Sequence, residues 1–162
     1  MKKGIFALLA VLLICSMALA ACSSGNSGSE KADESGEAAK PSNGGGPGQA
    51  VSLTGDATKG AQIFTDNCVV CHGDQGKGGV QNPGSKDGTV PPLNPIDTSM
   101  VNADYKTFAT NIDLFLEHGS TPEAAKSGDV PALAMKPFGD QKLLTPQQIA
   151  DVIAYVISLN KK

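Results

Sequence analysis

The 162-residue sequence has no arginine and no tryptophan, and its other aromatic residues are only two tyrosines and five phenylalanines. Proteins that bind nucleic acids need a basic surface, usually rich in arginine, whereas the net charge here is −3. The composition therefore argues against a nucleic-acid-binding protein. So few aromatic side chains also make a thin core for one domain with additional segments. A buried apolar cofactor would supply the missing volume.

The sequence also gives little support for β-strands or for a framework of disulfides. No stretch alternates apolar and polar residues over any length, so we expect an all-α fold without a sheet. Two of the four cysteines, Cys15 and Cys22, lie within or at the end of an N-terminal apolar run. Cys68 and Cys71 are the only pair in the body of the chain, and one CxxC pair cannot build a disulfide framework.

The N-terminus has the pattern of a secretory signal. Lys2 and Lys3 precede an apolar run over 5–21 that ends in small residues. The sequence Leu19-Ala20-Ala21-Cys22 resembles a bacterial lipoprotein lipobox. This resemblance implies cleavage before Cys22, whose sulfur would carry a diacylglycerol. An uncleaved membrane anchor and secretion without lipid are the alternatives, and the two membrane-bound readings place the rest of the chain outside the cytoplasmic membrane.

The segment after the signal is polar and rich in serine and glycine. Residues 23–52 contain too few apolar side chains to offset the entropy of ordering them. We therefore expect a signal peptide over 1–21, a lipidated flexible linker over 22–52 and a folded domain over 53–162. A linker of this length would have an r.m.s. span of about 30 Å.

The central motif of the domain is Cys68-Val69-Val70-Cys71-His72. Two thiols three positions apart, followed directly by a histidine, form the attachment sequence of c-type haem. Cys68 and Cys71 can form thioether bonds with the two vinyl groups of one porphyrin, and His72 can offer a nitrogen to iron. A thioredoxin-like site would need a surrounding βαβ pattern, and a structural zinc site would need a second ligand pair. The sequence contains neither.

Three helices are expected around this motif. They cover about residues 57–67, 104–118 and 146–159. Asp56 or Thr54 can cap the first, which leads straight into the motif. Thr145 and Gln148 form a capping box at the start of the last. Gly119 is a natural residue to end the middle helix.

Taken in order, these features over residues 53–162 resemble the monohaem class I c-type cytochromes. The resemblance implies an all-α cytochrome c fold whose N- and C-terminal helices cross near Gly60, Phe64 and Tyr155, with the haem in a crevice. The segment Val90-Pro91-Pro92-Leu93 also resembles a segment of the family, although Val90 stands where the family has glycine. There the Pro91 carbonyl would accept a hydrogen bond from Nδ1 of the proximal histidine. Leu93 would contact the haem.

The second axial ligand has three candidates. Met135 lies in Ala134-Met135-Lys136-Pro137-Phe138-Gly139, which resembles the ligand loop of the family, although Lys136 separates the methionine from the proline. The resemblance implies His72 and Met135 as axial ligands. Met100 could instead cover the haem edge. For His118, at the end of a helix, we expect a solvated cation favoured by the helix dipole.

The resemblance implies one covalent haem c and outer-sphere one-electron transfer, without enzymatic activity of its own. The expected protein is a lipid-anchored carrier on the extracytoplasmic face of a respiratory or photosynthetic membrane, or a cytochrome subunit of an oxidoreductase complex. Its donor would be a quinol-oxidising complex, and its acceptor a terminal oxidase, a reductase or a reaction centre. A haem enzyme or gas sensor with an open distal side is the alternative, with His118 as the only obvious distal group.

Overall fold

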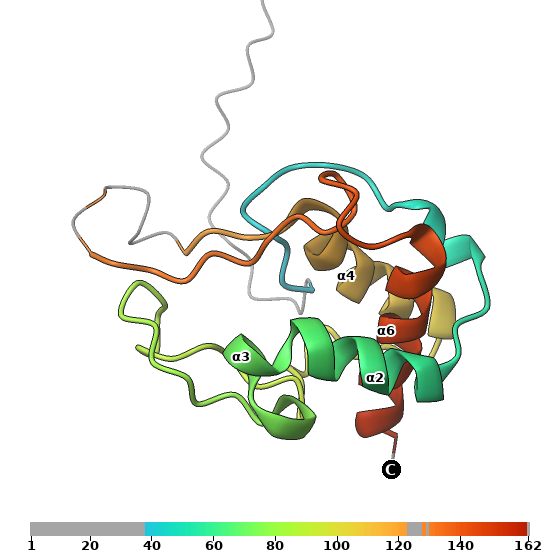
Figure 1. Ribbon diagram of the computed structural model, residues 1–162, viewed down its shortest axis with the longest axis horizontal. Coiled ribbons are helices and arrows are strands. Elements are labelled where there is room, and N and C mark those ends of the chain that lie inside the picture. Colours follow the sequence, from blue (N-terminus) through green and yellow to red (C-terminus); the bar gives the residue numbers. More distant parts are fainter. Residues whose placement is uncertain (1–37, 123–127, 129, 162) are drawn as a thin grey trace, which may run out of the picture. The chain divides into compact units, whose positions relative to one another are not determined.

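The computed structural model describes residues 38–122, 128 and 130–161. The expected signal peptide, the lipidation site at Cys22 and the linker up to residue 37 lie outside the described residues. In chain order the elements are the 3-10 helix η1 (Gln49–Ser52), α2 (Ala57–Asn67), α3 (Val69–His72), the 3-10 helix η2 (Asp74–Gly76), α4 (Tyr105–His118) and α6 (Pro146–Leu159) (Figure 1). The described residues form two isolated bridge pairs but no strand, which confirms the all-α expectation.

The helices begin where the capping residues predict. The carboxylate of Asp56 accepts hydrogen bonds from the Thr58 and Lys59 amides and so caps α2. At α6, Thr145 and Gln148 form both hydrogen bonds of a capping box, with Pro146 as the first helical residue. These side chains satisfy amide groups that a helix start leaves unpaired. None of the helices in the described part of the chain is long and apolar enough to cross a membrane.

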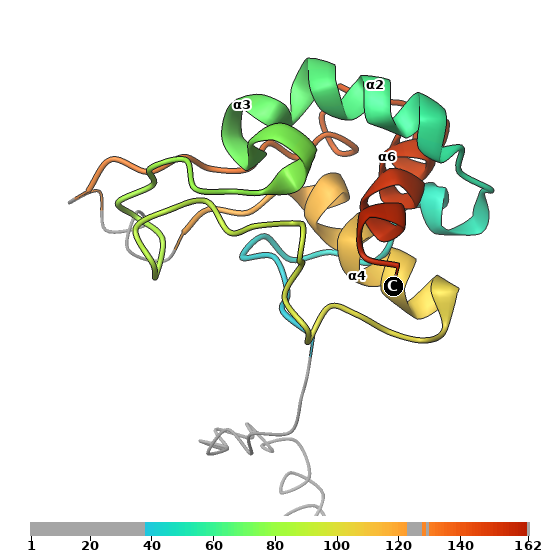
Figure 2. The same ribbon diagram turned by 90° about the horizontal axis from the view of Figure 1, so that it is seen from below.

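Helices α2 and α6 cross, as expected for the terminal helices of the domain, and the crossing is visible in two perpendicular views (Figure 1 and Figure 2). Gly60 lies at the contact, where a Cβ atom would collide with the main-chain carbonyl of Asp151. Beside it, the rings of Phe64 and Tyr155 pack with their centroids 5.3 Å apart and tilted by 59°. The backbones can approach this closely only because Gly60 has no side chain.

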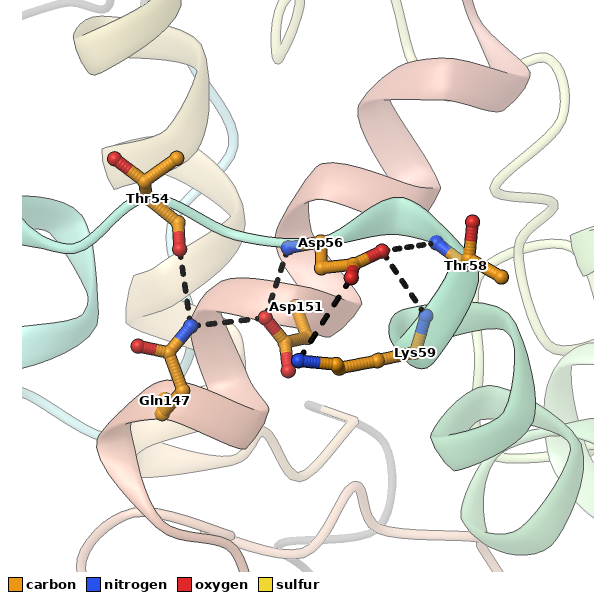
Figure 3. A network of polar contacts seen from close by, with 6 residues as sticks. All are labelled: Thr54, Asp56, Thr58, Lys59, Gln147 and Asp151. Carbon is orange, nitrogen blue, oxygen red and sulfur yellow. Dashed lines mark hydrogen bonds and ion pairs between the residues drawn. The ribbon is translucent and has the colours of Figure 1, made fainter.

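A buried carboxylate ties the start of α2 to α6 (Figure 3). Oδ1 of Asp151 accepts hydrogen bonds from the Asp56 amide at 2.8 Å and from Nε2 of Gln147 at 2.9 Å. The same Gln147 nitrogen donates to the Thr54 carbonyl at 3.0 Å. Because Asp151 is only 3% exposed, these partners offset the cost of burying a charged group.

The apolar core lies between α6, α2 and α4. Helix α6 contributes more buried apolar residues to it than any other element, namely Ile149, Ala150, Val152, Ile153, Val156 and Ile157. The largest fully buried apolar side chains are Phe64, Ile149, Val152, Ile153 and Val156, each at most 2% exposed. Apolar burial of this kind is the main favourable term in folding.

Residues 38–52 pack against the domain, so the prediction of a flexible linker is wrong for this part of the chain. We call residues 42–50 the strap. Ala50 is 2% exposed and belongs to the core, and the Gly48 amide donates to the Asp113 carboxylate of α4 at 2.6 Å. The Asn43 side chain donates to the His118 carbonyl at 2.7 Å. The strap is held mainly by polar groups of α4, which composition-based reasoning about apolar burial does not detect.

Candidate functional site

The CxxCH motif forms a single helical turn that continues directly from α2. Cys68 connects α2 to α3, and its carbonyl accepts hydrogen bonds from the Cys71 amide at 3.1 Å and the His72 amide at 2.8 Å. Residues at i, i+3 and i+4 of a helical turn share one side. The two thiols and the imidazole therefore lie on the same side of the turn. Val70, between them, is 77% exposed.

The environments of the two cysteines differ. Cys68 is 7% exposed, whereas Cys71 is half-buried, and neither is in a disulfide. Burial, and secondarily the charge of a neighbouring Cys71 thiolate, raises the pKa of Cys68 to about 11. The Cys68 thiol is therefore protonated at neutral pH in this environment.

The imidazole of His72 is enclosed and incompletely paired. Burial lowers its pKa, while the main chain of Pro91 beside the ring raises it by a smaller amount. Nδ1 is buried and has no hydrogen-bond partner of adequate geometry. The main chain of Pro91 thus lies near the ring, as expected, but the expected hydrogen bond to Nδ1 is not formed. A neutral imidazole is the form that binds a metal, so the lowered pKa suits a ligand.

Leu93 is fixed beside the turn from two directions. Its amide donates to the Gly76 carbonyl at 2.7 Å, and its carbonyl accepts a hydrogen bond from the Asn160 side chain at 2.8 Å. The Gly78 amide in turn donates to the His72 carbonyl at 2.7 Å. The loop after the motif therefore returns to the motif, and the partly buried Leu93 side chain packs against the core.

Met135 lies on a loop fixed to the end of α4. It forms an antiparallel bridge with Ser120, with hydrogen bonds of 2.7 and 3.1 Å, and its partly buried side chain packs against the core. Gly119, with φ of 65°, contacts the Met135 carbonyl so closely that a Cβ atom would collide with it. Gly119 therefore does more than end the helix, which was all that the sequence indicated.

The two rival ligands are occupied elsewhere. Met100 is 6% exposed, belongs to the apolar core, and its carbonyl accepts a hydrogen bond from the Asn111 side chain. In His118, Nδ1 lies 2.9 Å from Oδ2 of Asp140 and Nε2 lies 2.7 Å from the Gly46 carbonyl. Its side chain is 11% exposed and has two hydrogen-bond partners, so His118 is not the solvated side chain that the sequence predicts.

The residues at the turn fit a haem better than they fit a structural zinc ion or a thioredoxin-like redox site. No group of three or more His, Cys, Asp or Glu residues in the described ranges could hold a metal ion, so a zinc site finds no second ligand pair there. The described residues also contain no βαβ unit around the cysteines. Two free thiols and the partly buried imidazole of His72, on one side of the CxxCH turn, are the groups that attach a c-type haem and offer a nitrogen to its iron. Fold and site together define a haem-attaching helical domain.

Comparison with known proteins identifies the family. Residues 57–160 match the family model described as Cytochrome c. The chain therefore belongs to the cytochrome c family, and membership implies covalently bound haem c. No solved structure matches the chain.

Three curated relatives each match a little under two thirds of the chain. The cbb3-type cytochrome c oxidase subunit CcoP of Azospirillum is 29% identical over 105 residues, which are 64% of this chain and 30% of that protein. The CcoP subunit of Rhodobacter capsulatus is 32% identical over 64% of this chain and 29% of its own length. The subunit FixP of Sinorhizobium medicae is 32% identical over 63% of this chain and 29% of that protein. The chain thus spans less than a third of the length of these relatives.

Proposed function

We propose that the protein is a membrane-anchored one-electron carrier in an extracytoplasmic respiratory chain. A single haem c is attached to Cys68 and Cys71, with His72 and Met135 as its axial ligands. The observation that carries this proposal is the CxxCH turn, in which both thiols are free and lie on the same side as the partly buried imidazole of His72. When bound, the haem supplies a one-electron exchange between ferric and ferrous iron.

Each side chain of the site has a separate role in holding the haem. Cys68 and Cys71 attach it, and His72 offers one ring nitrogen while Pro91 faces the ring. Leu93, held by Gly76 and Asn160, provides an apolar contact that limits the access of water. Met135 closes the second axial position, and a methionine ligand gives a higher reduction potential than a second histidine would. With His72 and Met135 holding the iron, the haem would supply one-electron exchange without binding a substrate at the metal.

The partners and location follow from the relatives and from the N-terminus. The relatives are named as subunits of cbb3-type cytochrome c oxidases. A terminal oxidase is therefore the favoured acceptor, with a quinol-oxidising complex as donor, and the chain works either as a free carrier or as an oxidase subunit. Residues 1–21 are the signal peptide, and Cys22 carries the lipid. The linker is shorter than the sequence predicts, because the strap already belongs to the domain.

The experiment that tests the axial ligands compares three variants of the full-length holoprotein. Met135→Ala should abolish a weak far-red absorption band, lower the reduction potential and open the iron to carbon monoxide. These changes follow because the thioether favours ferrous iron and blocks the position. Met100→Ala and His118→Ala are the controls and should leave the axial spectrum unchanged, since their side chains have other partners. The covalent haem should remain in all three variants.

The contrast among the variants distinguishes the competing functions. If His118→Ala alone changes the axial spectrum, the haem has two histidine ligands. If none of the three variants changes it, the distal side is open and the protein is a haem enzyme or gas sensor. Either result would overturn the proposed carrier with histidine and methionine ligands.

A further inference from the structure

The loop that follows the CxxCH turn contains one deeply buried polar side chain. Asn82 is 3% exposed, and its amide pairs with both main-chain groups of Leu133, 51 residues further along the chain. Nδ2 donates to the Leu133 carbonyl at 3.1 Å, and Oδ1 accepts from the Leu133 amide at 2.9 Å. The side chain thus replaces the peptide group that a neighbouring strand would offer. Such a pair fixes position and orientation together.

Asn82 is itself held firmly by its own loop. The main-chain amide of Asn82 donates to the Gly88 carbonyl at 2.8 Å. Its main-chain carbonyl accepts hydrogen bonds from the main-chain amide and the hydroxyl of Ser85, each at 2.9 Å. The antiparallel bridge between Gln81 and Thr89 closes the same loop. The side-chain amide therefore projects from a backbone that is fixed by several hydrogen bonds, and it can act as a rigid support.

The residue that Asn82 holds is two positions before Met135. Met135 is held in turn by the bridge to Ser120 at the end of α4. The loop that carries Met135 is therefore fixed on one side by the segment that follows the CxxCH turn and on the other side by the end of α4. In both views, segment 130–137 and loop 73–90 extend to the same side of the helices (Figure 1 and Figure 2).

We propose that Asn82 is a positioning residue for the axial methionine: it keeps the Met135 sulfur on the iron by holding the Leu133 peptide against the loop of the CxxCH turn. This inference rests on the proposed ligation by Met135. A thioether is a weak ligand, so its occupancy depends on how tightly the loop is held. Loss of the two hydrogen bonds should favour a state with the sulfur detached.

The test compares Asn82→Ala and Asn82→Asp with a matched control, Asn111→Ala, in full-length holoprotein. Asn111 is a partly buried asparagine whose side chain, like that of Asn82, donates to a main-chain carbonyl, but its partner is Met100. Asn82→Ala should increase the population of the detached state about tenfold to a hundredfold, from the loss of two hydrogen bonds. Carbon monoxide should bind ferrous protein faster by that factor, and the far-red band should weaken. Asn82→Asp keeps the acceptor for the Leu133 amide, so its effect should be smaller.

The free energy of unfolding of each variant separates positioning from general stability. A merely structural Asn82 would give a stability loss like that of Asn111→Ala and an unchanged rate of carbon monoxide binding, and this result would overturn the inference. If Asn82→Ala does not yield holoprotein, Asn82→Asp decides the same question by its binding rate. If Met135→Ala abolishes the far-red band while neither Asn82 variant alters the binding rate, only the inference fails. An unchanged spectrum in Met135→Ala would overturn the proposed function as well.

Discussion

At the scale of single residues, the polar side chains that matter most bind main-chain groups far along the sequence. Asn82 binds Leu133, Asp151 binds the Asp56 amide, and Asp113 binds the Gly48 amide. A buried polar group that finds no partner costs more than a hydrogen bond gains, so each of these pairs constrains the fold. Removing the side-chain member of such a pair by substitution would leave its main-chain partner unsatisfied.

His118 shows how one ring can join three segments. Both of its partners, the Asp140 carboxylate and the Gly46 carbonyl, are acceptors. A neutral imidazole has one N–H and can donate to only one of them, whereas the imidazolium can donate to both. Accordingly, the hydrogen bond to Asp140, followed by that to Gly46, raises the pKa of His118 above its usual value. The strap is held most firmly when the ring is protonated.

This predicts a pH dependence of stability. Because the folded-state pKa of His118 lies above the unfolded value of about 6.5, its contribution is fully present below that pH. The contribution is lost as the pH rises through the folded-state pKa. The free energy of unfolding of the wild type minus that of His118→Gln should therefore fall as the pH rises. The neighbouring carboxyl groups, Asp113, Glu117 and Asp140, are retained in both proteins. A difference that does not vary with pH would contradict a charged ring in the folded protein.

The sequence predicts those site residues that lie close together along the chain. Cys68, Cys71 and His72 stand within one turn, and the family match confirms that the domain binds haem c. The ligand role of Met135 stays a prediction. Asn82 and the His118 contacts could not be found this way, because their partners lie 51 and 72 residues away. Composition alone gives no sign of such pairs.

At the scale of helices, local chemistry determined the boundaries and a close contact determined the packing. The caps at Asp56, Asp104 and Thr145 set the starts of α2, α4 and α6. The sequence indicates Thr145 directly and Asp56 as one of two candidates. The crossing near Gly60 and Phe64 was expected from the family resemblance. Neither the helix caps nor the family resemblance predicts that the strap is packed. Its glycines and polar residues bury little apolar surface, so its composition gives no sign of packing either.

Gly60→Ala should destabilise the protein although alanine favours helices. The helical preference gains about 1 kcal/mol, but an overpacked contact costs about 1–3 kcal/mol. Here the added atom would meet the rigid main-chain carbonyl of Asp151, so the larger cost should dominate. Denaturant unfolding of the holoprotein measures the difference. Gly44→Ala is the control, since open space surrounds Gly44. An equal or greater stability of Gly60→Ala would show that the helices do not touch there.

At the scale of the whole molecule, the part that matches the family and the part that packs together are different. The family match begins at residue 57, whereas Ala50 is already in the core and Ser42 contacts Ser120. A version of the protein beginning at residue 53 would leave the Asp113 carboxylate without the Gly48 amide. The domain boundary expected at residue 53 therefore falls inside the packed unit.

The membrane attachment proposed for the whole molecule is tested by Cys22→Ser. Without its sulfur, residue 22 cannot accept a diacylglycerol, so the variant should either be released from membranes or keep its signal peptide uncleaved. Membrane fractionation and the mass of the mature protein measure both outcomes. Ser23→Ala is a matched control that should be lipidated normally. A Cys22→Ser protein that is processed and membrane-bound like the wild type would show that no lipid is attached at Cys22.

The strap has a consequence for the order in which the chain folds. Its hydrogen-bond partners in and just after α4 are 65 to 79 residues further along the sequence. Closing loops of that length costs conformational entropy that no neighbouring contact offsets. The strap can therefore dock only after α4 has formed. The segment of the domain that is synthesised first is fixed late, so its resistance to proteolysis marks a chain that has completed its folding.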